Sequence, residues 1–113
     1  MENIIHLSTS EKSIIDDVWS IKSDGVELEQ AFYKSELPIQ IHDITAYIED
    51  ATVLLTFIAA LINLVKSKKH SAPTQPTINI HLHKTDEKII QFIHANKGEI
   101  NVNVHTKNGE SGD

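Results

Sequence analysis

Four segments of the chain alternate between apolar and polar side chains, which is the pattern of strands with one buried face. Residues 77–84 read TINIHLHK, in which every second side chain is apolar, and residues 100–105 repeat the alternation. Shorter alternating runs cover residues 3–7 and 37–43. Strands covered on both faces are apolar throughout, so we expect these four strands to be buried on one face only.

Three segments carry apolar residues at the three- and four-residue spacing of an amphipathic helix. Residues 8–22 and 85–97 are short examples. The longest, residues 44–69, keeps this spacing for most of its length, and Asp43 before it is expected to cap the helix. Residues 26–36 fit either a strand or a short helix, and we interpret them as a helix.

The predicted order of elements is β-α-β-α-β-α-β. A strand, helix and strand joined by short loops favour a right-handed parallel unit, and residues 77–106 are the clearest example. We therefore predict an α/β (α+β) fold, a two-layer open-faced sandwich with a four-stranded sheet and its helices on one face. Residues 1–106 are expected to form a single α/β interaction domain, and residues 107–113 a polar, disordered tail.

The polar phase of the predicted strands is rich in asparagine and histidine. The side chains expected on the exposed sheet face are His42, Asn79, His81, His83, Asn101, Asn103 and His105. Three of them, His81, His83 and His105, could supply the nitrogen ligands of a zinc site. No acid falls in the same phase to orient an imidazole, so we expect a face that contacts solvent or protein, without metal or cofactor.

Residues 51–65 form an apolar run of 15 residues, ATVLLTFIAALINLV, that is apolar nearly all round a helix. A two-layer sandwich covers only one side of such a helix. Leu54, Phe57, Leu61 and Leu64 lie off its main apolar stripe, and we expect them at an interface with a second copy of the chain. Leu61→Glu would then give a folded monomer.

Three other arrangements would also cover this helix: a different protein, packing within one chain, or a membrane. A helix of 15 residues spans about 22 Å, whereas the hydrocarbon core of a bilayer is about 30 Å thick. Acidic residues precede the run at Glu49 and Asp50, and carboxylates are costly in lipid. The membrane is therefore disfavoured.

Composition narrows the classes of function. The formal net charge is −6, and all basic residues are lysine. Arginine dominates recognition of phosphate and guanine, so nucleic-acid binding is not expected. The chain has no cysteine, and we find no nucleophile, acid–base pair or glycine-rich phosphate loop, so we do not expect an enzyme. The N-terminal run MENIIHLSTSEK lacks the features of a signal peptide, which favours a cytoplasmic location.

The run LTFIAALINLVKSKK, residues 55–69, leads into TINIHLH, residues 77–83. In the order of its elements over residues 37–106, the chain resembles the small effector-associated domains of prokaryotic conflict systems. This resemblance implies a non-enzymatic adaptor that recruits or regulates an effector through homotypic contacts.

Together these observations predict a small, non-catalytic protein-interaction module that forms a homo-oligomer. It would be an adaptor or regulator of a bacterial defence or toxin system, or a phage-encoded inhibitor that acts by binding. The alternative is a histidine-rich metal-binding domain with hydrolytic activity.

Overall fold

The chain has an α+β fold, with a mixed five-stranded sheet and three helices in the described part. The structure is a computed structural model that describes residues 2–34, 40–68, 76–84 and 86–106. The elements are β1 (Asn3–Thr9), α1 (Lys12–Ser20), β2 (Val26–Lys34), β3 (Gln40–Ile48), α2 (Ala51–Ser67), β4 (Thr77–Leu82), α3 (Glu87–Asn96) and β5 (Asn101–Thr106). The predicted tail at residues 107–113 lies outside the described residues.

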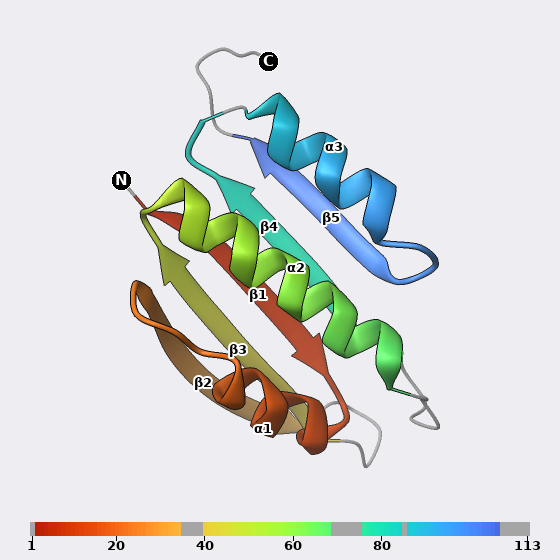
Figure 1. Cartoon of the computed structure of the whole chain (residues 1–113). Coiled ribbons are helices and arrows are strands. Elements are labelled where there is room, and N and C mark those ends of the chain that lie inside the picture. Colours follow the sequence, from red (N-terminus) through yellow and green to blue (C-terminus); the bar gives the residue numbers. More distant parts are fainter. Residues whose placement is uncertain (1, 35–39, 69–75, 85, 107–113) are drawn as a thin grey trace.

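The strands lie in the order β2-β3-β1-β4-β5, so β1 is the central strand (Figure 1). β1 is antiparallel to both β3 and β4, and β2 is antiparallel to β3. β4 and β5 are parallel and are connected through α3, which confirms the predicted parallel unit. The sheet is therefore antiparallel except at this last pair.

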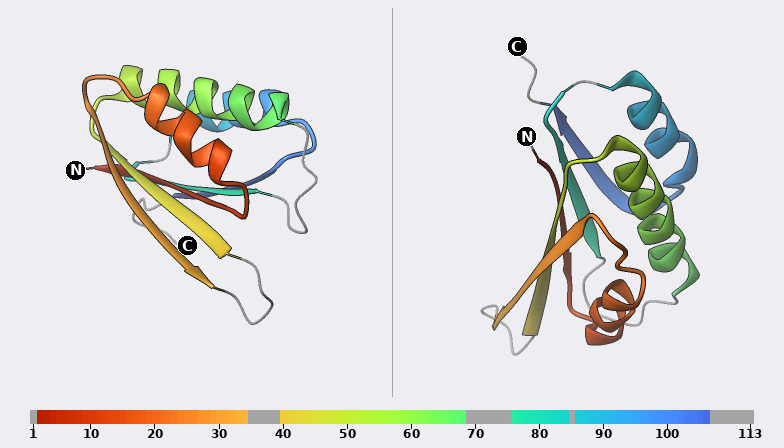
Figure 2. Two further views of the ribbon diagram at one scale, coloured as in Figure 1. Left: turned by 90° about the horizontal axis from the view of Figure 1, so that it is seen from below. Right: turned by 60° about the vertical axis from the view of Figure 1, so that its left-hand side comes forward.

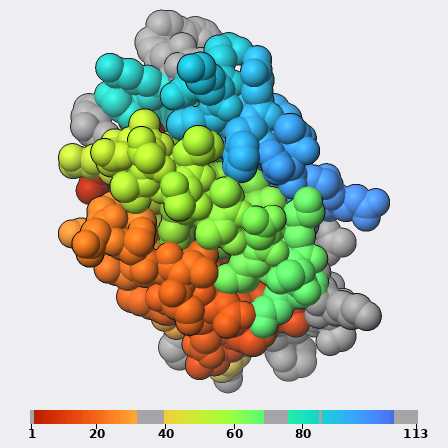
Figure 3. Space-filling view, viewed as in Figure 1, coloured from red at the N-terminus to blue at the C-terminus, as the bar shows by residue number. Residues whose placement is uncertain are grey.

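All three helices lie on the same face of the sheet (Figure 2). α2 runs between α1 and α3, and the three helices together form a continuous layer (Figure 3). The opposite face is covered by none of the described elements (Figure 2). Within the described residues, the sheet and the helices therefore form two layers, with the helices on one face as predicted.

The predicted helix at residues 26–36 is wrong over its described part, because Val26–Lys34 form the edge strand β2. This strand makes the sheet five-stranded rather than four-stranded and places two strands in succession along the chain. Val26 is buried and Leu28 is partly buried, whereas Glu27 and Glu29, which alternate with them, are exposed. Residues 26–34 therefore follow the two-residue period of a strand and not a helical period, because β3 pairs with them along their whole length.

The predicted boundary between the second strand and the long helix is also wrong. β3 continues to Ile48, and the helix begins only at Ala51. Asp50, and not Asp43, caps it: its Oδ1 accepts hydrogen bonds from the backbone N–H of Thr52 at 2.8 Å and of Val53 at 3.0 Å. Residues 44–48 fit both periods, and pairing with β1 and β2 on both sides favours the strand.

The side chains assigned to a dimer interface belong to the core. The exposed fractions of Leu54, Phe57 and Leu61 are 1%, 3% and 2%, and Leu64 is partly buried against the same cluster. α2 is flanked by α1 on one side and by α3 on the other (Figure 3), and it also packs against the sheet. The helix is therefore apolar nearly all round because three elements of its own chain contact it.

We accordingly expect Leu61→Glu to unfold the protein rather than to release a monomer, because it buries an unpaired carboxylate. For a graded test, Leu61→Ala should lower the free energy of unfolding by about 2–5 kcal/mol. Leu55→Ala on the exposed side of the same helix, where Leu55 is 37% exposed, should change it by about 0.5 kcal/mol or less. Urea unfolding followed by circular dichroism measures both. Equal losses in the two variants would contradict this packing.

Candidate functional site: the open face of the sheet

The strand register arranges the side chains of the uncovered face in three rows that cross all five strands. In the order β2, β3, β1, β4, β5, the first row is Glu27, Tyr47, Ile4, His81 and His105; the second is Glu29, Thr45, His6, Asn79 and Asn103; the third is Ala31, Asp43, Ser8, Thr77 and Asn101. We call these residues the open face. Its side chains alternate along each strand with those that pack under the helices.

The two halves of the open face differ in charge. The carboxylates of Glu27, Glu29 and Asp43 all lie on β2 and β3. β4 and β5 contribute only hydroxyl, amide and imidazole side chains to the open face. One half is therefore rich in acceptors, and the other carries groups that also donate hydrogen bonds.

Side-chain contacts link neighbouring strands across the open face. The rings of His81 and His105 stack with their centroids 4.7 Å apart and their planes at 13°. Asn103 Nδ2 donates to Asn79 Oδ1 at 3.2 Å. On the acidic half, the Tyr47 hydroxyl donates to Glu29 Oε1 at 2.7 Å. These contacts orient the side chains before any partner binds.

His6 stands between the two halves, on the central strand. Its Nε2 lies 3.7 Å from Asp43 Oδ2, which forms an ion pair when the imidazole is protonated. Asp43 therefore supplies the acid that we did not expect on this face. It was missed because residue 43 was taken as a helix cap, whereas it belongs to the exposed phase of β3.

A broad hollow of about 1010 Å³ lies on the open face over β1, β4 and β5. His6, His81, His83 and His105 line it, together with Glu2, Ile4, Thr45, Leu82 and Thr106. It is wide and open, which suits the surface of another macromolecule better than an enclosed small molecule.

Burial lowers the pKa of His81 below its usual value, and the nearby imidazoles of His105 and His6 lower it further. On the acidic half, the hydrogen bond to Glu29 raises the pKa of Tyr47. Burial and the neighbouring imidazoles both favour the neutral form of His81. In that form its ring still carries one N–H donor.

Most of the predicted exposed side chains lie where we expected them. Asn79, His81, Asn101, Asn103 and His105 all belong to the open face. His83 follows the end of β4 and lines the hollow, while its backbone N–H donates to Asn3 Oδ1 at 2.7 Å.

His42 is the exception, and the prediction for it is wrong. It is only 7% exposed and lies on the helix side of β3, opposite the buried Thr9 of β1. The pairing of Ile44 with Leu7 and of Ala46 with Ile5 fixes which phase of β3 faces the helices. Because side chains alternate strictly, His42 follows Ile44 into the core.

The acidic half of the open face was missed almost entirely. Glu27 and Glu29 were placed on a helix, and Thr45 and Tyr47 on the beginning of the long helix. The signal that could have found them is the alternation of residues 26–30 and 43–48, which the structure shows as two paired strands. A period of two over such short stretches is readily matched by a helical period as well.

The described part of the chain contains no group of three or more histidine, cysteine, aspartate or glutamate side chains placed to hold a metal ion. His81 and His105 do not converge, because their nearly parallel rings direct their in-plane lone pairs into separate planes. The metal-ligating trio predicted as an alternative is therefore not assembled by this arrangement.

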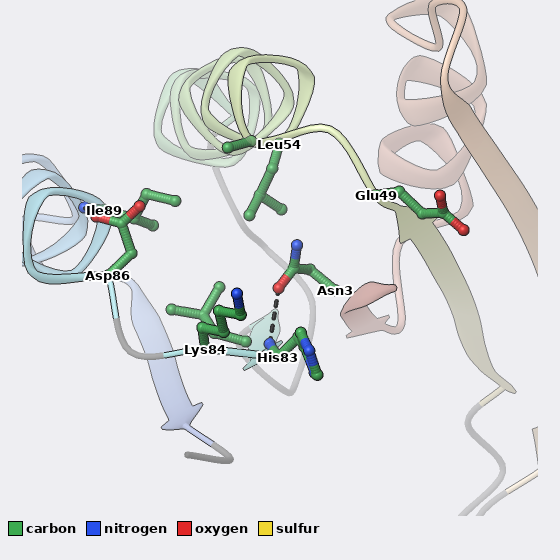
Figure 4. A pocket seen from close by; sticks show the side chains of 9 residues that line it. Asn3, Glu49, Leu54, His83, Lys84, Asp86 and Ile89 are labelled. Carbon is green, nitrogen blue, oxygen red and sulfur yellow. Dashed lines mark hydrogen bonds between the residues drawn. The ribbon is translucent and has the colours of Figure 1, made fainter. Parts of the chain in front are cut away.

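A smaller pocket of about 240 Å³ lies at the end of β4, near the N-termini of α2 and α3 (Figure 4). Asn3 stands at its centre, since its side chain accepts from the backbone of His83 and donates to Ile48 O. Lys84 contributes a cation and Glu49 and Asp86 two acids, above a floor that includes Leu54 and Ile89. Asp86 Oδ1 caps α3, and both polar atoms of the Asn3 side chain are hydrogen-bonded to the backbone of the chain.

No protein-family model, curated protein or solved structure matches the chain. None of the helices in the described residues is both long and apolar enough to cross a membrane.

The lowered pKa of His81 has a testable consequence. We expect His105→Asn to raise the pKa of His81 toward the ordinary value of about 6.5, because it removes a neighbouring imidazole and part of the cover over the ring. The neutral substitution Asn103→Ala, one pair further along the same strand, should leave it nearly unchanged. Titration of the histidine Cε1 protons by NMR measures both.

The same shift predicts the direction of the pH dependence of stability. The folded state takes up the proton at His81 less readily than the unfolded state, so the free energy of unfolding falls as pH decreases from about 6.5 through the lower folded pKa. Well above pH 6.5, His81 is neutral in both the folded and the unfolded state, so it does not change the free energy of unfolding. His81→Asn should therefore lose less stability than the unmodified protein between pH 7 and pH 5. A His81 pKa at or above 6.5 would contradict this electrostatic description.

Proposed function

We propose that the chain is a small, non-catalytic protein-interaction module that binds through the open face. The observation that carries this proposal is the position of α1, α2 and α3 on one side of the sheet (Figure 2), which leaves the open face without a cover from the described residues. The helix layer buries the apolar side chains, so the open face serves no core of its own.

The chemistry of the open face favours a protein partner over a nucleic acid. The carboxylates of Glu27, Glu29 and Asp43 line one half of it, and they would repel a phosphate backbone. The amides and imidazoles of the other half both donate and accept hydrogen bonds, as a polar protein surface requires. The hollow over β1, β4 and β5 gives such a surface room to enter.

The wider setting follows from the resemblance of residues 37–106 to effector-associated domains. In this proposal the protein is a cytoplasmic adaptor or regulator in a bacterial defence or toxin system. A phage-encoded inhibitor that acts by binding would use the same surface. In each case the module acts by binding, and any catalytic activity belongs to its partner.

Site-specific photo-crosslinking in living cells tests the proposed surface. A photoreactive residue at Asn103, which is exposed on the open face, should give covalent adducts with protein. The same residue at Gln91, which is exposed on α3 in the helix layer, is the matched control and should give few. The adducts are separated on denaturing gels and identified by mass spectrometry.

Adducts that form only from position 91, or equally from both positions, would overturn the assignment of the open face. An adduct that contains only the chain itself is a distinct result and bears on the inference below.

A further inference from the structure

We infer that the open face binds a second copy of the chain, face to face, with a two-fold axis parallel to β1. This inference rests on the proposed function of the open face and names its partner. It is drawn from the order of side chains in the three rows, in which the carboxylates of one half match hydrogen-bond donors of the other half.

A two-fold rotation about an axis along β1 exchanges the two ends of every row. In the first row, Glu27 of one copy then lies opposite His105 of the other, and Tyr47 lies opposite His81. Every such pairing occurs twice, as an isologous interface requires. Imidazole N–H groups thereby face a carboxylate and a phenol, in either protonation state of the ring.

The second row follows the same rule. Glu29 lies opposite Asn103, and Thr45 lies opposite Asn79. Glu29 already accepts from Tyr47 with Oε1, which leaves Oε2 for the amide across the interface. Near the axis, Ile4 and His6 meet their own counterparts, and each His6 has Asp43 beside it to offset a charge.

The alternative two-fold axis, perpendicular to the strands, is disfavoured by charge. It would place β2 over β2 and β5 over β5, so that the acidic halves of the two copies face each other, as do the halves that carry the imidazoles. Like charges held together cost free energy, whereas the axis along β1 brings opposite polarities together. The uneven distribution of acids therefore selects one axis.

The shape of the sheet permits the same arrangement. The strands twist progressively from β2 to β5 (Figure 2), which gives the open face the form of a saddle. A two-fold rotation about the central strand maps a regular saddle onto itself, so two such faces remain evenly spaced. Tyr47 of one copy would then enter the hollow beside His81 of the other, where there is room for a side chain.

The size of the open face sets the expected strength. Five strands spaced about 4.8 Å apart and about six residues long give a face of roughly 24 by 20 Å. Two such faces bury on the order of 1,000 Å² in total, which is at the lower end for specific interfaces. Because most of the contacts are polar, we expect a reversible dimer with a dissociation constant on the order of 10 µM.

Cysteine cross-linking tests both the partner and the axis, because the chain has no cysteine of its own. Ala31→Cys and Asn101→Cys lie at opposite ends of the third row, are both exposed, and remove none of the proposed acidic or imidazole groups. A bis-maleimide with a spacer of about 8–10 Å matches the distance between packed sheets. An equimolar mixture of the two variants should cross-link at about 100 µM protein, which exceeds the expected dissociation constant.

Each variant alone should give little product, because the proposed axis separates residue 31 from residue 31 and residue 101 from residue 101. Cross-linking of Ala31→Cys to itself would overturn the axis along β1. Light scattering that shows a monomer at 100 µM, with no cross-linking in any mixture, would overturn self-association altogether. Photo-crosslinking from Asn103 to a different protein would still support the proposed function in that case, so the two failures are distinguishable.

Discussion

The burial of α2 is the interaction on which the rest of this structure depends. Its apolar side chains are buried on three sides, by the sheet and by the two flanking helices. α1 and α3 must lie on the same face of the sheet as α2 in order to flank it (Figure 3). The helix layer is thus complete on one face, and the opposite face of the sheet is left without a cover from the described residues.

The pairing of the central strand β1 determines which side chains form the open face. β1 pairs with β3 on one side and with β4 on the other, and it thereby joins the β2–β3 pair to the parallel unit formed by β4, α3 and β5. The register of these pairs fixes which side chains stand next to each other on both faces. Apolar residues under the helices and polar residues on the open face are therefore two consequences of one set of hydrogen bonds.

The open face owes its character to segments that are distant in the sequence. Its acids come from β2 and β3. Its imidazole pair comes from β4 and β5, in which paired residues are more than twenty positions apart in the sequence. The asymmetry between a carboxylate-rich half and a half that carries donors is a property of the assembled sheet. A surface of this kind is self-complementary under a two-fold rotation, and a uniformly polar surface would lack that preference for one axis.

The sequence by itself determined the parallel unit at residues 77–106, the existence of a long buried helix, and the position on the open face of Asn79, His81, Asn101, Asn103 and His105. These features rest on local periodicity, which is unambiguous in long alternating or helical runs. The tertiary structure decided what local periodicity left open. Residues 26–34 and 44–48 fit two periods, and only the hydrogen bonds to β3, β1 and β2 made them strands.

The burial of His42 and the burial of the surface of α2 also depend on the tertiary structure. His42 is buried because the register of β3 against β1 takes precedence over the polarity of one side chain. The surface of α2 belongs to the core because α1 and α3 contact it, and no property of residues 51–65 alone distinguishes cover by a neighbouring helix from cover by another molecule. The apolar pattern specifies that a surface must be buried, whereas the fold determines which surface buries it.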